Sequence, residues 1–265
     1  MLLRKLTIPT LALFSGFLLS SCSKSTSETA TLMPYALSYG DSLLYPRDQS
    51  SDYLVYPAQQ KTGSYSAYPE GIAIDPTTGA INISKSETGM RYLVTYTSPA
   101  GETATTPVIL SGVNFRDGFY HLSAGDSILS PVYIGNNRVM PGGSLFDDGN
   151  GARAGGCAVQ TGDGSINLAQ TVRNGAFGII PSNDSRRDFN IVYRVNDISN
   201  RSSNKINVRF FYYHTMADVA PDVLQILHDR GEDGLISNPT GLVHNNSFVT
   251  ERGKNRPPCV VLIAD

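Results

Sequence analysis

The chain has 265 residues, with 21 Lys and Arg against 23 Asp and Glu, so its formal net charge at pH 7 is −2. Neither sign of charge forms a run, which argues against a nucleic-acid partner. Tryptophan is absent, tyrosine, glycine and proline are frequent, and apolar residues recur at helical spacing only in the last fifth of the chain. This pattern predicts an all-β protein with one large domain or two domains of ordinary size.

The N-terminus has the order of a secretory signal. Arg4 and Lys5 precede an apolar stretch from Leu11 to Leu19, and small residues then lead to Cys22. The apolar stretch is much shorter than the roughly 20 residues that a membrane-spanning helix needs. We therefore expect residues 1–21 to be a signal peptide that is removed and does not belong to the fold.

The residues Leu19-Ser20-Ser21-Cys22 resemble the lipobox of bacterial lipoproteins. The resemblance implies cleavage before Cys22 and a thioether between its sulfur and diacylglycerol, so that the membrane is a partner. An ordinary secretory signal with a chance cysteine is the alternative. Residues 22–31 are rich in Ser and Thr and are predicted to be a flexible tether. The expected location is the bacterial cell envelope, at the outer membrane.

An internal repeat organises the rest of the chain. A shift of 85 residues without a gap aligns residues 35–46 with 120–131 and residues 67–83 with 152–168. The aligned pairs include turn glycines and apolar positions of both copies: Gly40 and Gly125, Ala67 and Ala152, Gly79 and Gly164, Ile81 and Ile166. More pairs are identical than chance provides over such a span, which indicates a duplication.

Each copy has the pattern of consecutive strands. In the first copy, residues 71–74 and 80–83 alternate around the turn residues 75–79, which predicts a hairpin. Further strands are predicted at residues 91–96 and 106–110. A unit of about 85 residues with frequent turns is typical of an immunoglobulin-like sandwich.

The second copy continues into a region of different character. Its later strands are predicted at residues 189–195 and 205–213, after an insertion around residues 181–187. Residues 220–230 have apolar residues at helical spacing, with a proline near the start and a glycine after the end, which predicts a short helix. The apolar run at residues 259–263 predicts a buried terminal strand.

Residues 71–82, Gly-Ile-Ala-Ile-Asp-Pro-Thr-Thr-Gly-Ala-Ile-Asn, resemble the hairpin of cadherin-like and immunoglobulin-like repeats of bacterial envelope proteins. The resemblance implies two tandem immunoglobulin-like β-sandwiches, residues 32–115 and residues 116–265, the second extended by the helix and the terminal strand. It also implies a role in adhesion or binding. The acidic calcium ligands of cadherins have no counterpart at residues 84–87, so no metal or other cofactor is expected.

Gly40-Asp41-Ser42-Leu43 spells the first block of the GDSL hydrolases, in which the serine is the nucleophile and a histidine is its base. That family also has an Asp-x-x-His block. None of the histidines in the later part of the chain has an aspartate three positions before it: His214, His228 and His244. Similar residues recur at 125–128, which we interpret as the same structural turn in the second copy. We therefore predict that Ser42 is not catalytic.

Three further features are ambiguous. Asp147-Asp148-Gly149-Asn150-Gly151 lacks the last acidic ligand of an EF-hand and is predicted to be a solvated turn. Tyr212 and Tyr213 could form an exposed platform for carbohydrate, but a strand that is apolar on both sides favours burial. Cys157 and Cys259 could form a disulfide in an oxidising compartment or remain two buried free thiols.

Together these features predict a lipid-anchored envelope protein without chemistry of its own, acting as a binding, adhesion or structural module. Its expected ligand is a protein or a carbohydrate. An envelope hydrolase acting on esters or glycans is the first alternative, and a cleft that unites a serine, a histidine and an acid would favour it. An accessory subunit of a glycan-uptake or secretion complex is the second.

Overall fold

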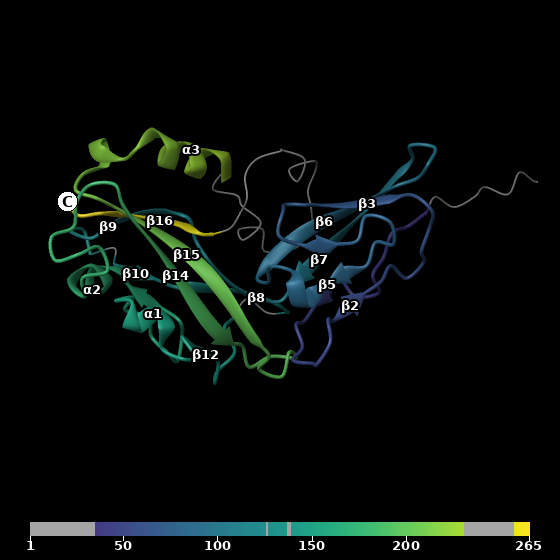
Figure 1. Ribbon diagram of the computed structural model, residues 1–265, viewed down its shortest axis with the longest axis horizontal. Coiled ribbons are helices and arrows are strands. Elements are labelled where there is room, and N and C mark those ends of the chain that lie inside the picture. The colour runs from purple at the N-terminus through teal and green to yellow at the C-terminus, as the bar shows by residue number, and fades with distance from the viewer. Residues whose placement is uncertain (1–34, 126, 137–138, 231–256) are drawn as a thin grey trace, which may run out of the picture. The chain divides into compact units, whose positions relative to one another are not determined.

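The computed structural model describes residues 35–125, 127–136, 139–230 and 257–265 (Figure 1). Within them the chain is all-β with a short helix near the C-terminus, which confirms the predicted fold class. The signal peptide, Cys22, the tether and His244 lie outside the described residues. None of the helices within the described ranges is long and apolar enough to cross a membrane.

The first half, residues 35–111, consists of two sheets around one core. One sheet has the order β1-β7-β6-β3 and the other the order β2-β5-β4. Their strands are β1 (Leu43–Leu44), β2 (Leu54–Val55), β3 (Ser64–Tyr68), β4 (Ala73–Ile74), β5 (Ile81–Asn82), β6 (Met90–Thr97) and β7 (Thr103–Leu110), with a 3-10 turn, η1 (Ile83–Lys85), after β5. Every second residue of β6 is buried, and these side chains share a core with Ile81 of the other sheet and Ile83 of η1.

The second half, residues 112–265, has a five-stranded sheet in the order β12-β14-β15-β16-β9 and two pairs, β10-β13 and β11-β8. Its strands are β8 (Gly112–Phe115), β9 (Gly118–His121), β10 (Ile128–Leu129), β11 (Pro131–Ile134), β12 (Leu145–Phe146), β13 (Ile166–Asn167), β14 (Ser185–Arg194), β15 (Ser203–Tyr213) and β16 (Cys259–Ile263). The helical elements are α1 (Gly151–Ala154), α2 (Leu168–Arg173), η2 (Met216–Asp218) and α3 (Pro221–Arg230). The predicted helix and terminal strand are thus confirmed.

The five-stranded sheet is covered on both faces. Val260 and Leu262 of β16 belong to a core with β14 and β15, whereas Val261 and Ile263 belong to a second cluster with Val223 of α3. Figure 1 shows α3 lying over this part of the sheet. Because successive side chains of a strand point to opposite faces, an uninterrupted apolar strand needs cover on both sides.

The hairpins of the two copies have the same geometry, as a duplication predicts. Gly79 and Gly164 have φ of +72° and +76°, and each donates its N–H to the carbonyl four residues earlier at 2.9 Å. The side chains of Asn82 and Asn167 each cap the turn that follows by accepting the N–H three residues later, at 3.2 and 2.8 Å. The shift of 85 residues therefore holds through this segment.

The predicted alignment at a constant shift of 85 residues is wrong for the residues that precede the hairpin. Ala67 lies in strand β3, whereas Ala152 lies in helix α1. The true counterpart of Tyr65 in β3 is Phe146 in β12, because each ring lies against its hairpin glycine and each N–H is donated to the hairpin turn at 2.8 Å. These two residues are 81 positions apart, and α1 accommodates the four extra residues of the second copy.

The prediction that the two Gly-Asp-Ser segments occupy the same place is also wrong. β1, which follows the first segment, pairs in parallel with β7. β10, which follows the second, pairs antiparallel with β13, placing Ile128 opposite Asn167. In the first half it is β2 that makes this pairing, with Leu54 opposite Asn82. A two-residue apolar strand fits either partner, so its own residues do not determine its place.

Candidate functional site

Ser42 lies in a surface turn immediately before β1. Asp41 accepts the N–H of Leu43 on its carboxylate at 3.0 Å, and the Ser42 carbonyl accepts the N–H of Ile109 at 2.7 Å. Gly40 has φ of +83°, which glycine adopts without strain. The residues therefore form the predicted turn, in which the carboxylate stabilises the backbone.

Asp147 is more buried than a solvated turn requires. Its side chain is 1% exposed and accepts the N–H groups of Ala152 and Arg153 at 2.8 and 3.0 Å. The Arg153 Nε donates to the same carboxylate at 3.0 Å. Asp147 thus stabilises the N-terminus of α1, and the prediction of a fully solvated turn is wrong at this residue. Within the described residues, no three His, Cys, Asp or Glu side chains gather as metal ligands.

The tyrosines and cysteines of the second half are core residues. Tyr212 and Tyr213 are 7% and 0% exposed and face opposite sides of the sheet, which confirms that they are buried. Cys157 and Cys259 are both free and buried, and they also belong to the clusters on opposite sides of the sheet. The structure therefore contains two free thiols instead of a disulfide. Burial raises the pKa of the Cys157 thiol to about 12.

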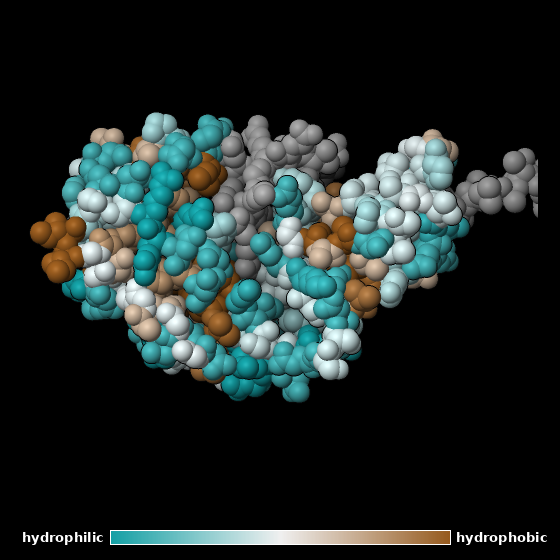
Figure 2. Space-filling model, in the orientation of Figure 1, coloured by the Kyte–Doolittle hydropathy of each residue, from teal (hydrophilic) through white to brown (hydrophobic). Residues whose placement is uncertain are grey.

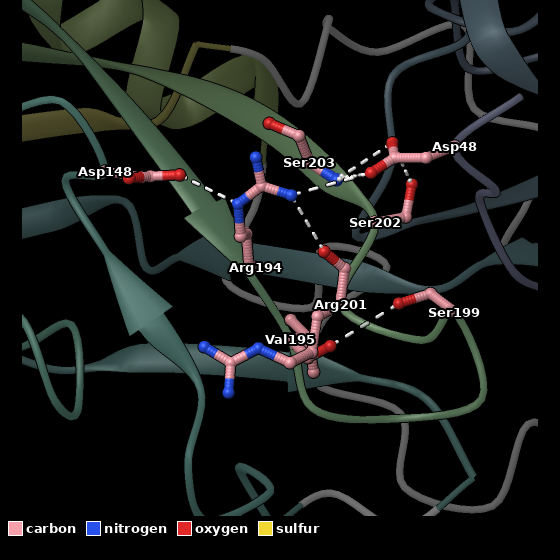
Figure 3. A network of polar contacts seen from close by, with 8 residues as sticks. All are labelled: Asp48, Asp148, Arg194, Val195, Ser199, Arg201, Ser202 and Ser203. Atoms are coloured by element: carbon pink, nitrogen blue, oxygen red, sulfur yellow. Dashed lines mark hydrogen bonds and ion pairs between the residues drawn. The ribbon is translucent and has the colours of Figure 1, made fainter. Parts of the chain in front are cut away.

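An arginine connects the two halves at their junction (Figure 3). Arg194 at the end of β14 donates from Nε to Asp148 at 2.7 Å and lies 3.5 Å from Asp48 of the first half through an NH group. Asp48 in turn accepts the Oγ–H of Ser202 at 2.9 Å and the N–H of Ser203 at 3.1 Å. A guanidinium between two carboxylates thereby links the first half to the hairpin between β14 and β15.

That hairpin has an unusual backbone. Asn200 and Arg201 both have positive φ, +54° and +60°, a region that residues with a Cβ rarely adopt. The Arg201 carbonyl accepts a hydrogen bond from Arg194 at 3.1 Å, and the Ser199 Oγ donates to the Val195 carbonyl at 3.4 Å (Figure 3). The contacts with Arg194 and Asp48 therefore hold a strained turn against the first half.

A buried layer of hydroxyl groups lies beneath this network. Tyr193 Oη is 2.8 Å from the Oγ1 of Thr88 in the first half. Asp197 accepts hydrogen bonds from Ser111 at 2.8 Å and from Tyr133 at 2.7 Å. Burial raises the pKa of Tyr133, so this hydroxyl keeps its proton for Asp197. The buried polar groups at the junction therefore find hydrogen-bond partners in both halves. The two halves belong to one compact unit, residues 35–265.

The loop between α2 and β14, residues 174–184, exposes two large apolar side chains. Ile179 is 100% exposed and Ile180 is 88% exposed, and we call this pair the apolar apex. Figure 2 shows strongly hydrophobic atoms at the edge of the molecule where α2 lies in Figure 1. The sequence predicted an insertion here but not its function. An Ile-Ile pair between glycine and proline, flanked by polar residues, is the signal that could have indicated an exposed apex.

The base of the same loop is fixed to the sheet. The Phe177 ring contacts the Tyr212 ring with centroids 5.6 Å apart. Asn183 accepts the backbone N–H of His214 at 2.7 Å, and Asp184 accepts the hydroxyl of Tyr213 at 2.6 Å. The apex is thus held by contacts on both sides of it along the chain.

No family model matches the chain, and no curated protein matches it. Solved structures with some similarity include mouse clustered PcdhgC3 EC1-3, at 10% identity over 66% of this chain and 66% of that one, with a TM-score of 0.21. Drosophila N-cadherin EC1-4 is 12% identical over 64% of this chain and 46% of its own, also with a TM-score of 0.21. The chain thus spans less than two thirds of these proteins. The all-β architecture rests on the strands described above.

Proposed function

We propose that this protein is a lipoprotein of the bacterial cell envelope, anchored at the outer membrane by lipid on Cys22. We further propose that its two tandem β-sandwich repeats act as a non-catalytic binding, adhesion or structural module for a protein or carbohydrate ligand. The lipobox-like Leu19-Ser20-Ser21-Cys22 supports the anchor, and the Ser/Thr-rich residues 22–31 supply a tether.

One observation carries the non-catalytic part of the proposal: several aspartate carboxylates of the chain accept hydrogen bonds from its own backbone and side chains. Asp41 caps the turn at Ser42, and Asp147 caps α1 while it pairs with Arg153. Asp48 and Asp197 join the two halves. Carboxylates used in this way stabilise a scaffold, whereas a general base needs a free lone pair directed at its substrate.

Fatty-acid labelling of cells that produce the protein tests the anchor. The wild-type chain should incorporate label, and Cys22→Ala should not, because the thioether forms at this sulfur. Label that persists in Cys22→Ala would contradict the anchor. Secretion without label in both proteins would favour the ordinary signal peptide.

Hydrolysis of a short-chain ester tests the non-catalytic role. Purified protein and its Ser42→Ala variant should both lack serine-dependent activity. Ser127→Ala is the matched control, since Ser127 follows the second Gly-Asp pair and precedes β10. Activity that disappears only in Ser42→Ala would favour the envelope hydrolase. Stable recovery of one fixed partner from envelope extracts would instead favour the accessory subunit.

A further inference from the structure

The apolar apex exposes two isoleucine side chains to water, which is unfavourable for the free protein. Burial of an isoleucine side chain is favourable because it removes apolar surface from water, yet Ile179 and Ile180 are almost wholly exposed. A loop with a fixed base, here through Phe177, Asn183 and Asp184, loses little conformational freedom when its tip is buried. Exposed apolar side chains on a preformed loop indicate a contact surface.

The size of the apex limits what it can contact. A specific protein interface buries about 800 Å² on each partner, with some 20–30 residues on each side. The apex offers two adjacent side chains at the tip of a loop, and the residues next to it in the sequence, Ser182 to Asp184, are polar and exposed. A fluid apolar phase needs no complementary pocket, so a lipid bilayer accommodates such a tip where a protein surface would need a matching cavity.

The chain before the folded unit supplies the second argument. Only residues 23–34 separate Cys22 from Tyr35, a length that reaches about 40 Å when fully extended. A lipid on Cys22 therefore keeps the folded unit close to a bilayer. Contact between the apex and that bilayer becomes intramolecular, with an effective concentration in the millimolar range.

Two arginines bracket the loop. Arg173 ends α2 before the loop, and Arg187 lies in β14 after it; both are exposed. Arg173 donates to the side-chain oxygen of Gln170 at 2.9 Å, and the Arg187 guanidinium lies over the Phe189 ring. Neither has an acidic partner in the part of the chain that the structure describes, unlike Arg186, which pairs with Asp184 and Asp222. Arginines that flank an apolar loop along the chain are suited to bind lipid phosphates at an anionic surface.

We propose that Ile179 and Ile180 insert into the interface of the same bilayer that holds the lipid on Cys22, and so dock the folded unit on the membrane. This inference rests on the proposed anchor. The docked loop would fix which face of the two β-sandwich halves points away from the membrane.

The test places a fluorophore at the apex of the lipidated protein in vesicles of phosphatidylethanolamine and phosphatidylglycerol. Ile179→Cys provides the attachment site, because the native Cys157 and Cys259 are buried and react slowly. Ile198→Cys is the matched control: Ile198 is another exposed isoleucine, 71% exposed, in the hairpin between β14 and β15. Iodide quenches the probe from water, and nitroxide-labelled lipids quench it from the bilayer.

The label at residue 179 should be quenched severalfold less by iodide than the label at residue 198, and only the former should be quenched by nitroxide lipids. Adding Arg173→Gln and Arg187→Gln should weaken that difference. Two equally water-accessible labels on vesicle-bound protein would overturn the docking and leave the anchor intact. Shielding that depends on protein concentration and not on lipid would overturn it in favour of self-association. Protein that fails to float with vesicles would overturn the anchor itself.

Discussion

The edge of the main sheet is built differently in the two halves. In the first half the short strand β1 lies directly beside β7. In the second half β16 lies beside β15, the counterpart of β7, and β9 is paired on the far side of β16. Both arrangements are parallel, but the second adds a strand from the C-terminus. An added strand that is apolar on both faces requires a further layer, which α3 and Val219 supply.

Leu262→Ala should lower the free energy of unfolding much more than Leu43→Ala does. Leu262 in β16 is 0% exposed and packs in the core with β14 and β15. Leu43 in β1 is half-buried at the edge of its sheet. We expect a loss of about 2–5 kcal/mol of unfolding free energy for Leu262→Ala and clearly less for Leu43→Ala. Urea unfolding measures both, and equal losses would contradict the central place of β16.

The hairpin glycines are the places where the two halves agree. Gly79→Ala and Gly164→Ala should each destabilise by about 1–3 kcal/mol, because φ is positive and a Cβ would lie 2.7 Å from Tyr65 and 2.5 Å from Phe146. Gly101→Ala is the matched control, since its φ of +88° has the same strain in open space. Thermal unfolding should rank Gly101→Ala as the mildest. An opposite ranking would show that backbone strain outweighs the aromatic contact.

Sequence patterns predicted the features that depend on local chemistry. The turn residues around Gly79 and Gly164 predicted a hairpin, and both glycines adopt the positive φ that such a turn requires. The caps at Asn82 and Asn167 were seen only in the structure. Strand partners depend on distant segments. Nothing in the two leucines of β1 distinguishes β7 from another partner.

The same distinction explains the candidate sites. The Asp41 turn at Ser42 was predictable because its acceptor and donor are two residues apart. The junction was not, since Asp48 meets Ser202 across 154 positions of sequence. The burial of Asp147 likewise depends on α1, which arises from the four residues that the second copy adds.

Asp48→Ala should loosen the junction without unfolding either half. The substitution removes the acceptor for the Ser202 hydroxyl and the Ser203 N–H and leaves Arg194 paired with Asp148 alone. Amide hydrogen exchange at Ser203 should become faster, while exchange in the core of β6 should not change. Asp52→Ala, which removes an exposed ion pair with Lys85 inside the first half, is the control. Unchanged exchange at Ser203 in Asp48→Ala would show that the hairpin holds its strained backbone unaided.

The smallest expected effect is a pH dependence at the base of the apolar apex. The hydrogen bond from Tyr213 holds the pKa of Asp184 below its ordinary value of 3.8, with a further contribution from Arg186. A carboxylate with a depressed pKa stabilises the folded state fully above its unfolded pKa, and this contribution is lost as the pH falls through the folded pKa. Hydrogen exchange in residues 174–184 should therefore be constant from pH 7 to about 4, after correction for intrinsic rates, and rise below that.

Asp184→Asn should remove the pH dependence, because an amide oxygen still accepts the hydrogen bond from Tyr213 but the amide does not titrate in this range. Asp163→Asn is the matched control, since Asp163 is also exposed and accepts the N–H of Ser165 at 2.9 Å, outside this loop. If exchange rises equally at low pH in Asp163→Asn and in Asp184→Asn, the acid sensitivity does not come from the hydrogen bond between Asp184 and Tyr213.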